Sequence, residues 1–321
     1  MPESKTKKIK KINVAAIQMV CKEGQTRENL KHAQSMVEKA VKKDAKLVLL
    51  PELMPSGYMV TEAIWDFAET MDGQSATWLK AIAKKHGIHI GFSFLEAEGE
   101  DFYNTFILAT PKGDIAGRVR KSPAASIEAN FYKPGDDSHV IETDLGRIGI
   151  SICYENMLYD RICELSTLSV DIVLSPSAAG RPKPLIPGDV ERLEKMIKRW
   201  RCLYSDTLGV PNVVANRVGL LETELPGMLP YLKSSFAGLS AITSAEGVVL
   251  AELGDAEGIL VEEVELNPSK KKKMTPKRYG KMWAIPVPWY SFLYPMTEKS
   301  GEERYKKSQA RPIKAKEKSS I

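Results

Sequence analysis

The chain has 321 residues, of which 43% are hydrophobic and 27% are charged, and its formal net charge is +5 at pH 7. One domain with a large buried core is the simplest organisation for this length, although length alone would also allow two domains. No run approaches about 18 apolar residues, and the four cysteines form no CxxC pair and no pattern with the four histidines. The sequence therefore argues against a membrane-spanning helix, a zinc site and a disulfide framework.

Positive charge is concentrated at the two ends of the chain. Residues 1–12 contain five lysines and one acidic residue, and residues 268–321 contain fifteen lysines or arginines and four acidic residues. We interpret residues 1–11 as a basic N-terminal tail and residues 267–321 as a basic C-terminal extension, with the lysine runs at 270–273 and 306–318 in solvent. Residues 1–11 lack the apolar segment of a signal peptide, and the sequence carries no nucleic-acid-binding signature. We therefore expect a cytoplasmic protein with no nucleic acid and no membrane as partner.

In chain order, the hydrophobic pattern predicts strands that alternate with amphipathic helices. The first half contains strands at 12–18, 46–50 and 88–94, helices at 27–43 and 75–86, and short strands near 104–110, 115–120 and 138–142. One face of the first helix consists of Leu30, Ala33, Val37, Ala40 and Val41. Thr26 is the predicted N-terminal cap of this helix.

The second half continues this alternation and then becomes mostly β-structure. A strand at 147–152 leads to a helix that ends near 167, followed by a strand at 170–174 and a long helix at 188–207. Residues 211–265 have the pattern of strands, with a turn at 244–247. Composition and periodicity together predict an α/β domain with a mixed sheet.

The C-terminal extension contains an unusual segment, residues 280–295. It is too aromatic for a free tail and too rich in proline for a helix. We expect an extended arm that lies on its own domain or on a partner subunit. Contact of Trp283, Trp289 and Tyr294 with a membrane surface is the less favoured alternative.

Cys153 is the first catalytic candidate. It follows the β-branched run 147–152 and precedes the polar residues Tyr154, Glu155 and Asn156. A position between a buried strand and a predicted helix displays a nucleophile, and the free N–H groups of the helix favour its thiolate. A lone cysteine in an apolar run is more often core filler, so other residues have to support the assignment.

Glu52 and Lys121 provide that support. Glu52 follows the apolar run 47–51, and Lys121 follows the short extended stretch 118–120. Both therefore lie, like Cys153, at the carboxyl end of a predicted strand, where open α/β sheets build their sites. Either residue alone would be interpreted as a solvated surface charge. Together, a carboxylate can act as the base for a thiol, and an ammonium can stabilise the oxyanion that forms.

The segments that carry these residues resemble the nitrilase, or carbon-nitrogen hydrolase, superfamily, and its amidase-like branch in particular. The similar segments occur in the family's order within residues 12–266: 51–53, 120–121, 128–136, 149–155, 171–177, 213–219 and 236–240. The resemblance implies a four-layer αββα sandwich and a triad of Glu52, Lys121 and Cys153. It also implies no metal, no cofactor, and assembly as a homodimer or a larger homo-oligomer.

The same resemblance implies residues that support the triad. Glu128 corresponds to the family's second glutamate and would position Lys121 or the substrate, although a structural loop carboxylate is an alternative. The backbone N–H of Tyr154 would help to bind the oxyanion. Substrate contacts are assigned, on the resemblance alone, to Tyr58, Phe131, Glu155, Ser177 and Ala178.

The implied activity is hydrolysis of a small amide through a thioester on Cys153, with release of ammonia. Tyr154 favours an amide over a nitrile, Glu155 and Asn156 keep a nitrilase open, and an N-carbamoyl amine amidohydrolase would use the same triad. Arg181 or Lys183 would meet an acidic substrate, although a surface loop is the simpler interpretation. A non-catalytic scaffold with basic tails is the remaining alternative, and it is disfavoured because every triad position carries the reactive residue.

Overall fold

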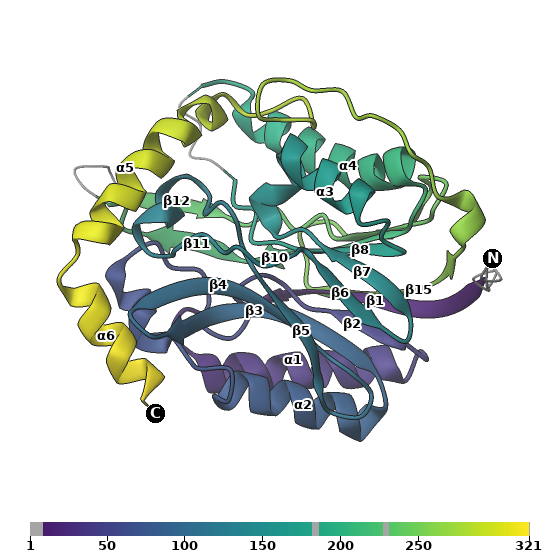
Figure 1. Cartoon of the computed structure of the whole chain (residues 1–321), viewed down its shortest axis with the longest axis horizontal. Helices are drawn as coiled ribbons and strands as arrows, with labels where there is room; N and C mark the ends of the chain where they lie inside the picture. The colour runs from purple at the N-terminus through teal and green to yellow at the C-terminus, as the bar shows by residue number, and fades with distance from the viewer. Residues whose placement is uncertain (1–8, 182–185, 227–230, 321) are drawn as a thin grey trace, which may run out of the picture.

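Two β-sheets packed face to face form the centre of the molecule, and helices cover the outer face of each sheet (Figure 1). The computed structural model describes residues 9–181, 186–226 and 231–320. Helices α1 (Thr26–Val41) and α2 (Gln74–His86) lie on one sheet, and α3 (Tyr159–Thr167) and α4 (Asp189–Leu208) lie on the other. This order of layers confirms the predicted αββα sandwich.

The first sheet has seven strands, and β1 pairs on both of its sides. Strands β1, β2 and β3 are parallel, whereas β3, β4 and β5 follow each other in antiparallel pairs. The strands of this sheet are β1 (Lys10–Val20), β2 (Leu47–Leu49), β3 (His89–Glu98), β4 (Asp101–Ala109), β5 (Ile115–Arg120), β10 (Arg217–Val218) and β15 (Gly258–Leu266).

The second sheet has six strands in the order β14-β13-β9-β8-β7-β6. Its central strands β7, β8 and β9 are parallel, so their carboxyl ends lie at the same edge. The strands are β6 (Val140–Thr143), β7 (Gly146–Ile150), β8 (Ile172–Pro176), β9 (Asn212–Ala215), β13 (Ala241–Thr243) and β14 (Val249–Glu252). A separate two-stranded sheet consists of β11 (Leu220–Thr223) and β12 (Leu232–Ser235).

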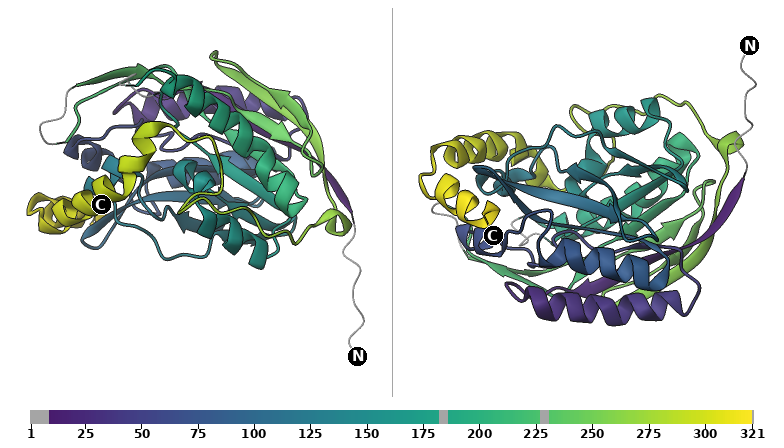
Figure 2. Two further views of the ribbon diagram at one scale, coloured as in Figure 1. Left: turned by 90° about the horizontal axis from the view of Figure 1, so that it is seen from above. Right: turned by 60° about the horizontal axis from the view of Figure 1, so that its bottom comes forward.

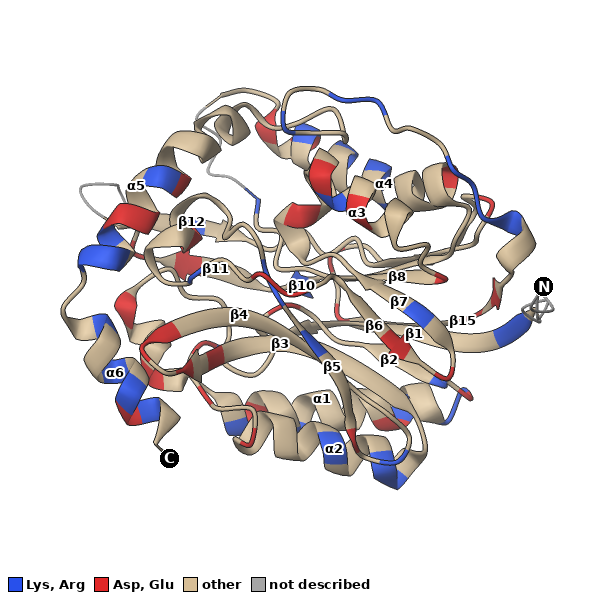
Figure 3. Cartoon of the chain, viewed as in Figure 1, with Lys and Arg blue, Asp and Glu red and all other residues tan. Residues whose placement is uncertain are grey.

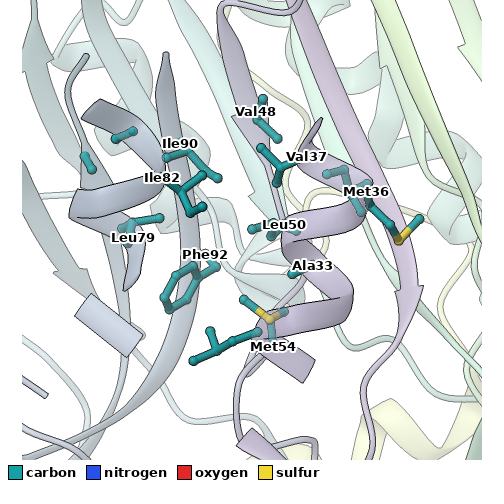
Figure 4. Packing of buried hydrophobic residues seen from close by; sticks show 14 of the residues in the cluster. Ala33, Met36, Val37, Val48, Leu50, Met54, Leu79, Ile82, Ile90 and Phe92 are labelled. Carbon is teal, nitrogen blue, oxygen red and sulfur yellow. The ribbon is translucent and has the colours of Figure 1, made fainter. Parts of the chain in front are cut away.

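The interior consists of stacked apolar layers. Between α1, α2 and the first sheet, Ala33 and Val37 face Val48, Ile90 and Phe92 (Figure 4). A second apolar layer fills the space between the two sheets, and a third lies between the second sheet and helices α3 and α4. Burial on both faces explains why residues 14–19 of β1 and 90–95 of β3 are mostly apolar rather than alternating.

Helix α1 confirms the predicted buried face and contradicts the predicted N-terminal cap. The expected face is largely correct, because Leu30, Ala33, Val37 and Ala40 are buried. The expected cap is wrong. Thr26 is already the first helical residue, and Gln25 precedes the helix without a side-chain capping hydrogen bond. Asn29 instead fastens the preceding turn, since its side chain exchanges hydrogen bonds with the backbone of Lys22 at 2.8 and 2.7 Å.

The C-terminal extension is folded rather than a free tail, although most of its lysines remain exposed or half-buried. After a short 3-10 helix η5 (Trp289–Leu293), α5 (Tyr294–Lys307) and α6 (Ala310–Ser319) follow each other along one side of the molecule (Figure 2). Basic residues recur along α6 (Figure 3), where Lys314 pairs with Asp66 at 2.8 Å and Lys316 with Glu100 at 2.7 Å. The predicted extended arm is therefore irregular only up to Pro288 and helical from Tyr294 onward. In the part of the chain that the structure describes, no helix is long and apolar enough to cross a membrane.

Candidate active site

Three reactive side chains meet where strands of both sheets end. Glu52 lies three residues after β2, Lys121 directly follows β5, and Cys153 lies three residues after β7. Because β2 and β5 belong to the first sheet and β7 to the second, the site is built between the two sheets. The three strand ends that we expected to converge lie together in the structure.

Lys121 holds two carboxylates together. Its Nζ donates to Glu52 Oε1 at 2.7 Å and to Glu128 Oε2 at 2.7 Å, and all three side chains are almost fully buried. Asn104 Nδ2 donates to Glu52 Oε1 at 2.7 Å, and Tyr58 Oη donates to Glu128 Oε1 at 2.7 Å. The buried charges are thus paired and hydrogen-bonded, which is the condition under which a protein tolerates them.

The electrostatics of this cluster keep Lys121 charged. Burial alone would lower the pKa of Lys121, but the carboxylates of Glu128 and Glu52 outweigh it and raise that pKa well above its usual value. Burial also raises the pKa of Glu128, and Lys121 opposes this rise while the charge of Glu52 adds to it. The site therefore offers a permanent cation beside a carboxylate, Glu128, whose proton affinity is raised by burial.

Cys153 occupies a strained position beside this cluster. Its φ angle is +50°, in the left-handed region that residues other than glycine seldom adopt. Burial, followed by the charge of Glu52, raises the pKa of the thiol well above its usual value, although Lys121 and the backbone N–H of Ala178 favour the thiolate. The expectation that the following helix would favour the thiolate is therefore outweighed, and the thiol needs a base.

The backbone N–H of Ala178 connects the thiol to Glu52. It donates to Glu52 Oε2 at 2.9 Å and also lies next to the Cys153 sulfur, so the carboxylate and the thiol are neighbours. Ala178 lines the cavity that contains Cys153, as predicted for a substrate contact, and so do Tyr58, Glu128 and Tyr154. These residues, together with Lys121 behind them, are the part of the predicted site that the structure brings together.

Glu155 does not belong to that set, which corrects its assignment as a substrate contact. Its side chain is fully buried and accepts hydrogen bonds from Ile152 N and Ser122 N, both at 2.7 Å. Burial alone would raise the pKa of Glu155, but His139 and Arg161, with these hydrogen bonds, lower it to about 2. Glu155 is a charged internal brace for the turn that starts at Cys153.

Phe131 and Ser177 are also misassigned as substrate contacts. Phe131 is 4% exposed and packs edge-on against Trp65, with ring centroids 6.4 Å apart. Ser177 is fully buried, and its hydroxyl donates to the carbonyl of Ser175 at 3.3 Å. Neither residue lines the cavity that contains Cys153, within the part of the chain that the structure describes.

The cavity in front of Cys153 has a volume of about 630 Å³. Its walls come from the turn after Cys153, from α4, from the hairpin of β11 and β12, and from residues 289–294 of the C-terminal extension. The contribution of the extension was not predicted, although its aromatic residues were the signal that set it apart from a free tail.

The proposed contact of Arg181 with an acidic substrate conflicts with its bonding. Arg181 reaches the cavity, but its guanidinium already pairs with Glu194 at 2.8 Å and with Asp255 at 2.9 Å. It also donates to the carbonyl of Phe236 at 3.0 Å. Its charge and its donors are therefore engaged within the protein. Lys183, the other cation considered for this role, lies outside the described residues.

Among the residues with described positions, no group of three or more His, Cys, Asp or Glu side chains is arranged to hold a metal ion. The carboxylates nearest Cys153 are instead occupied by the ammonium of Lys121.

Comparisons with known proteins agree with this geometry. The family model described as carbon-nitrogen hydrolase matches residues 13–271. The chain is 33% identical to an omega-amidase of Xenopus tropicalis, over 74% of this chain and 83% of the relative. It is 28% identical to the 2-oxoglutaramate amidase of Bacillus subtilis, over 81% of this chain and 93% of the relative.

The solved structure of a carbon-nitrogen hydrolase from Helicobacter pylori G27 has the same fold. It matches with a TM-score of 0.73 at 24% identity, and the match covers 80% of this chain and 90% of the other. The family match extends over most of the chain and includes Glu52, Lys121, Glu128 and Cys153. The chain belongs to the carbon-nitrogen hydrolase family.

Proposed function

We propose that the protein hydrolyses the carbon–nitrogen bond of a small amide through a thioester on Cys153. The observation that carries this proposal is the ammonium of Lys121, held at 2.7 Å from both Glu52 and Glu128 beside a thiol that lines a cavity. The names of the two relatives, both amidases, support the choice of an amide.

In the first half of the reaction, Glu52 takes the proton of the Cys153 thiol as the sulfur bonds to the amide carbon. The electrons of the carbonyl move to oxygen, and Lys121 with the backbone N–H of Tyr154 stabilises the oxyanion, at about 3 to 4 kcal/mol per donor. The carbonyl then re-forms and the carbon–nitrogen bond breaks. Glu52 gives its proton to the departing nitrogen, which leaves as ammonia.

In the second half, water replaces ammonia. Glu52 accepts a proton from the water that attacks the thioester, and the carbon–sulfur bond breaks to release the carboxylic acid. The proton returns to the sulfur and restores the thiol. The high pKa of the thiol favours this arrangement, because a neutral resting thiol does not compete with the substrate for the charge of Lys121.

Glu128 is assigned a positioning role in this scheme. It accepts a hydrogen bond from Lys121, as Glu52 does, and Tyr58 donates to Glu128 in turn. Burial raises the pKa of Glu128.

The cytoplasmic location, the absence of a cofactor and the homo-oligomeric assembly expected from the sequence form part of the same proposal. Light scattering coupled to size-exclusion chromatography tests the assembly, since a monomer at micromolar concentration would contradict it. Activity that is unchanged by EDTA is expected, and inhibition by the chelator would count against the mechanism.

The test of the function is ammonia release by the wild type and by Cys153→Ala on amides, N-carbamoyl amines and nitriles, with the acid product identified. The wild type is expected to act on amides and the variant on nothing. Cys163→Ala, which removes a half-buried thiol on α3, is the matched control and keeps full activity. Turnover by Cys153→Ala would overturn the thioester, and preference for a nitrile or an N-carbamoyl amine would reassign the substrate. No turnover by the wild type would favour a scaffold.

A further inference from the structure

A segment outside the family match forms one wall of the active-site cavity. The family model ends at residue 271, but Trp289, Tyr290, Phe292, Leu293 and Tyr294 all line the cavity in front of Cys153. These residues span η5 and the first residue of α5. The reactive groups and this wall therefore come from different parts of the chain.

One end of the segment is fastened to the turn that carries Cys153. Trp283 is buried, its Nε1 donates to the carbonyl of Asn156 at 2.8 Å, and its backbone N–H donates to the carbonyl of Met157 at 2.9 Å. Asn156 and Met157 belong to the 3-10 helix η3 (Cys153–Met157). The turn that carries Cys153 thus fixes the path of the extension.

The other end is fastened to the 3-10 helix η2 (Ser126–Asn130), which carries Glu128. Helix α5 packs on η2 so closely that a Cβ atom on Gly301 would lie 2.9 Å from the backbone of Ala129. Thr297 Oγ1 and Ser126 Oγ share a hydrogen bond of 2.9 Å. Between the two anchors, the backbone N–H of Trp289 donates to Asp189 Oδ1 at 2.9 Å.

Tyr294 brings the wall next to the nucleophile. Its ring packs edge-on against Tyr154, the residue after Cys153, with centroids 4.9 Å apart, and the ring of Tyr290 lies 5.7 Å from that of Tyr294. Trp289 and Phe292 also pack together, at 5.5 Å, and they are 49% and 66% exposed. The half-buried tyrosine pair thus lies near the reaction centre, and the exposed pair lies further out along the cavity.

The wall formed by α4 is apolar as well, since this helix contributes Leu193, Met196 and Trp200. A volume of about 630 Å³ is far more than a short amide fills and is typical of sites for larger organic ligands. Arg181, at the edge of this space, is neutralised by Glu194 and Asp255. Burial of apolar surface against the described lining favours binding, and no cation in that lining is free to pair with a carboxylate.

We propose that residues 289–294 form an acyl-group site and that the substrate is an amide with an aryl or long-chain apolar acyl group. This inference rests on the proposed amidase function and adds the substrate class. Trp289 and Phe292 determine specificity and take no part in the bond-breaking steps, because they contact the remote part of the acyl group.

The test compares kcat/KM for acetamide, hexanamide, phenylacetamide and the monoamide of succinic acid. Wild type is expected to prefer hexanamide and phenylacetamide over the other two by at least about tenfold. Trp289→Ala and Phe292→Ala are expected to lower kcat/KM for the two apolar amides by about tenfold, through KM rather than kcat. The kcat/KM for acetamide is expected to fall less than that for the two apolar amides, because acetamide has no remote acyl part. The control is Met296→Ala, an exposed residue one turn further along α5 that does not line the cavity, and it leaves all four values unchanged.

The outcomes separate this inference from the function on which it rests. If turnover depends on Cys153 but acetamide or the succinic monoamide is preferred, the acyl-group site is wrong and the amidase stands. Equal losses on all four amides in Phe292→Ala would also overturn it. Binding of hexanamide and acetamide to Cys153→Ala, measured by calorimetry, gives a readout without turnover. Tighter binding of hexanamide supports the site even if no amide is hydrolysed, and equal binding contradicts it.

Discussion

The reactive cluster and the C-terminal wall face the same cavity, but different forces hold them in place. Glu52, Lys121 and Glu128 are buried and joined by two short ion pairs at the ends of strands. The wall is aromatic, half exposed, and held through backbone hydrogen bonds and the docking of α5. Charges that act on a reacting bond need a rigid, dry frame, whereas a surface that only buries apolar groups needs shape alone.

This difference has a consequence for how each region responds to change. A substitution in the cluster leaves a buried charge without its partner, which is costly and abolishes the chemistry. A substitution in the wall removes apolar area, so it changes which substrate binds best and leaves the chemistry intact. The following variants examine each side of this contrast.

The largest effect is expected from Glu52→Gln, which removes the proposed base while keeping its shape. The amide cannot take the thiol proton, so kcat/KM should fall by about 10³-fold. Steady-state kinetics with phenylacetamide measures the loss. Glu96→Gln is the matched control, because Glu96 is an equally buried carboxylate that pairs with Arg118 and Arg120. This control is expected to lower stability and to leave the activity of the folded protein intact. Retention of more than a tenth of wild-type activity by Glu52→Gln would break the contrast.

Glu155→Gln addresses the frame beneath the nucleophile. The pKa of Glu155 is lowered to about 2 in the folded protein from an ordinary value of 4.5, so its stabilisation is present above about pH 4.5 and is lost as the pH falls towards 2. At pH 7 the free energy of unfolding of the variant should be lower than that of wild type by on the order of 3 kcal/mol. This difference should shrink on acidification. Urea titrations between pH 7 and pH 3 measure it.

The control for this experiment is Glu142→Gln, a mostly exposed carboxylate beside Arg147. It should match wild type within about 0.5 kcal/mol at every pH. A Glu155→Gln penalty that does not change with pH would show that hydrogen-bond geometry, rather than the charge of Glu155, stabilises the turn.

Gly301→Val tests the docking of α5. The new side chain would meet the backbone of Ala129 and Asn130 at 2.9 Å, and backbone atoms cannot move aside cheaply. We expect a loss of about 2 kcal/mol, faster proteolysis of the extension, and a higher KM for apolar amides. Gly254→Val, at an exposed glycine with open space around it, is the matched control and should change stability by less than about 0.5 kcal/mol. If the extension of Gly301→Val is cleaved no faster than that of wild type, the contact between α5 and η2 does not hold the wall in place.

The smallest effect is expected from Trp283→Phe, which keeps a smaller aromatic ring but removes the hydrogen bond to the carbonyl of Asn156. Loss of one buried hydrogen bond should cost about 1 kcal/mol in thermal or urea unfolding. Trp78→Phe is the control, because the Trp78 indole N–H has no hydrogen-bond partner among the described residues. If both variants lose the same stability, ring packing rather than the hydrogen bond anchors the segment.

The reactive cluster and the C-terminal wall also differ in how much of each could be predicted from the sequence. Glu52 and Cys153 could be found because each follows a strongly apolar run, and Lys121 because it follows a short extended stretch; all three lie at the carboxyl ends of strands. Asn104, which donates to Glu52, was missed even though it is a polar residue inside the apolar strand β4. Glu155 was misassigned because its position, two residues after Cys153, does not indicate whether its side chain faces the substrate or the core.

The C-terminal helices were missed because their stability comes from docking rather than from an apolar pattern. Pro295 indicated a break, but proline at the start of a helix is compatible with α5. Gly301 is a poor helix former by itself, but it allows the close approach of α5 to η2. In α6, Lys314 and Lys316 are held by acidic residues of the body, a long-range pairing that no local pattern contains.

The most direct test of the division between chemistry and selection is a competition in the presence of hydroxylamine. Equal concentrations of phenylacetamide and acetamide are supplied to wild type and to Phe292→Ala, and the two hydroxamates and two acids are quantified. The thioester predicts that both amides yield hydroxamate, that phenylacetyl products dominate with wild type by at least about tenfold, and that Phe292→Ala brings the two amides towards equality. The ratio of hydroxamate to acid for each acyl group should stay the same in both proteins. Acid without hydroxamate, or the same amide preference in both proteins, would contradict the account.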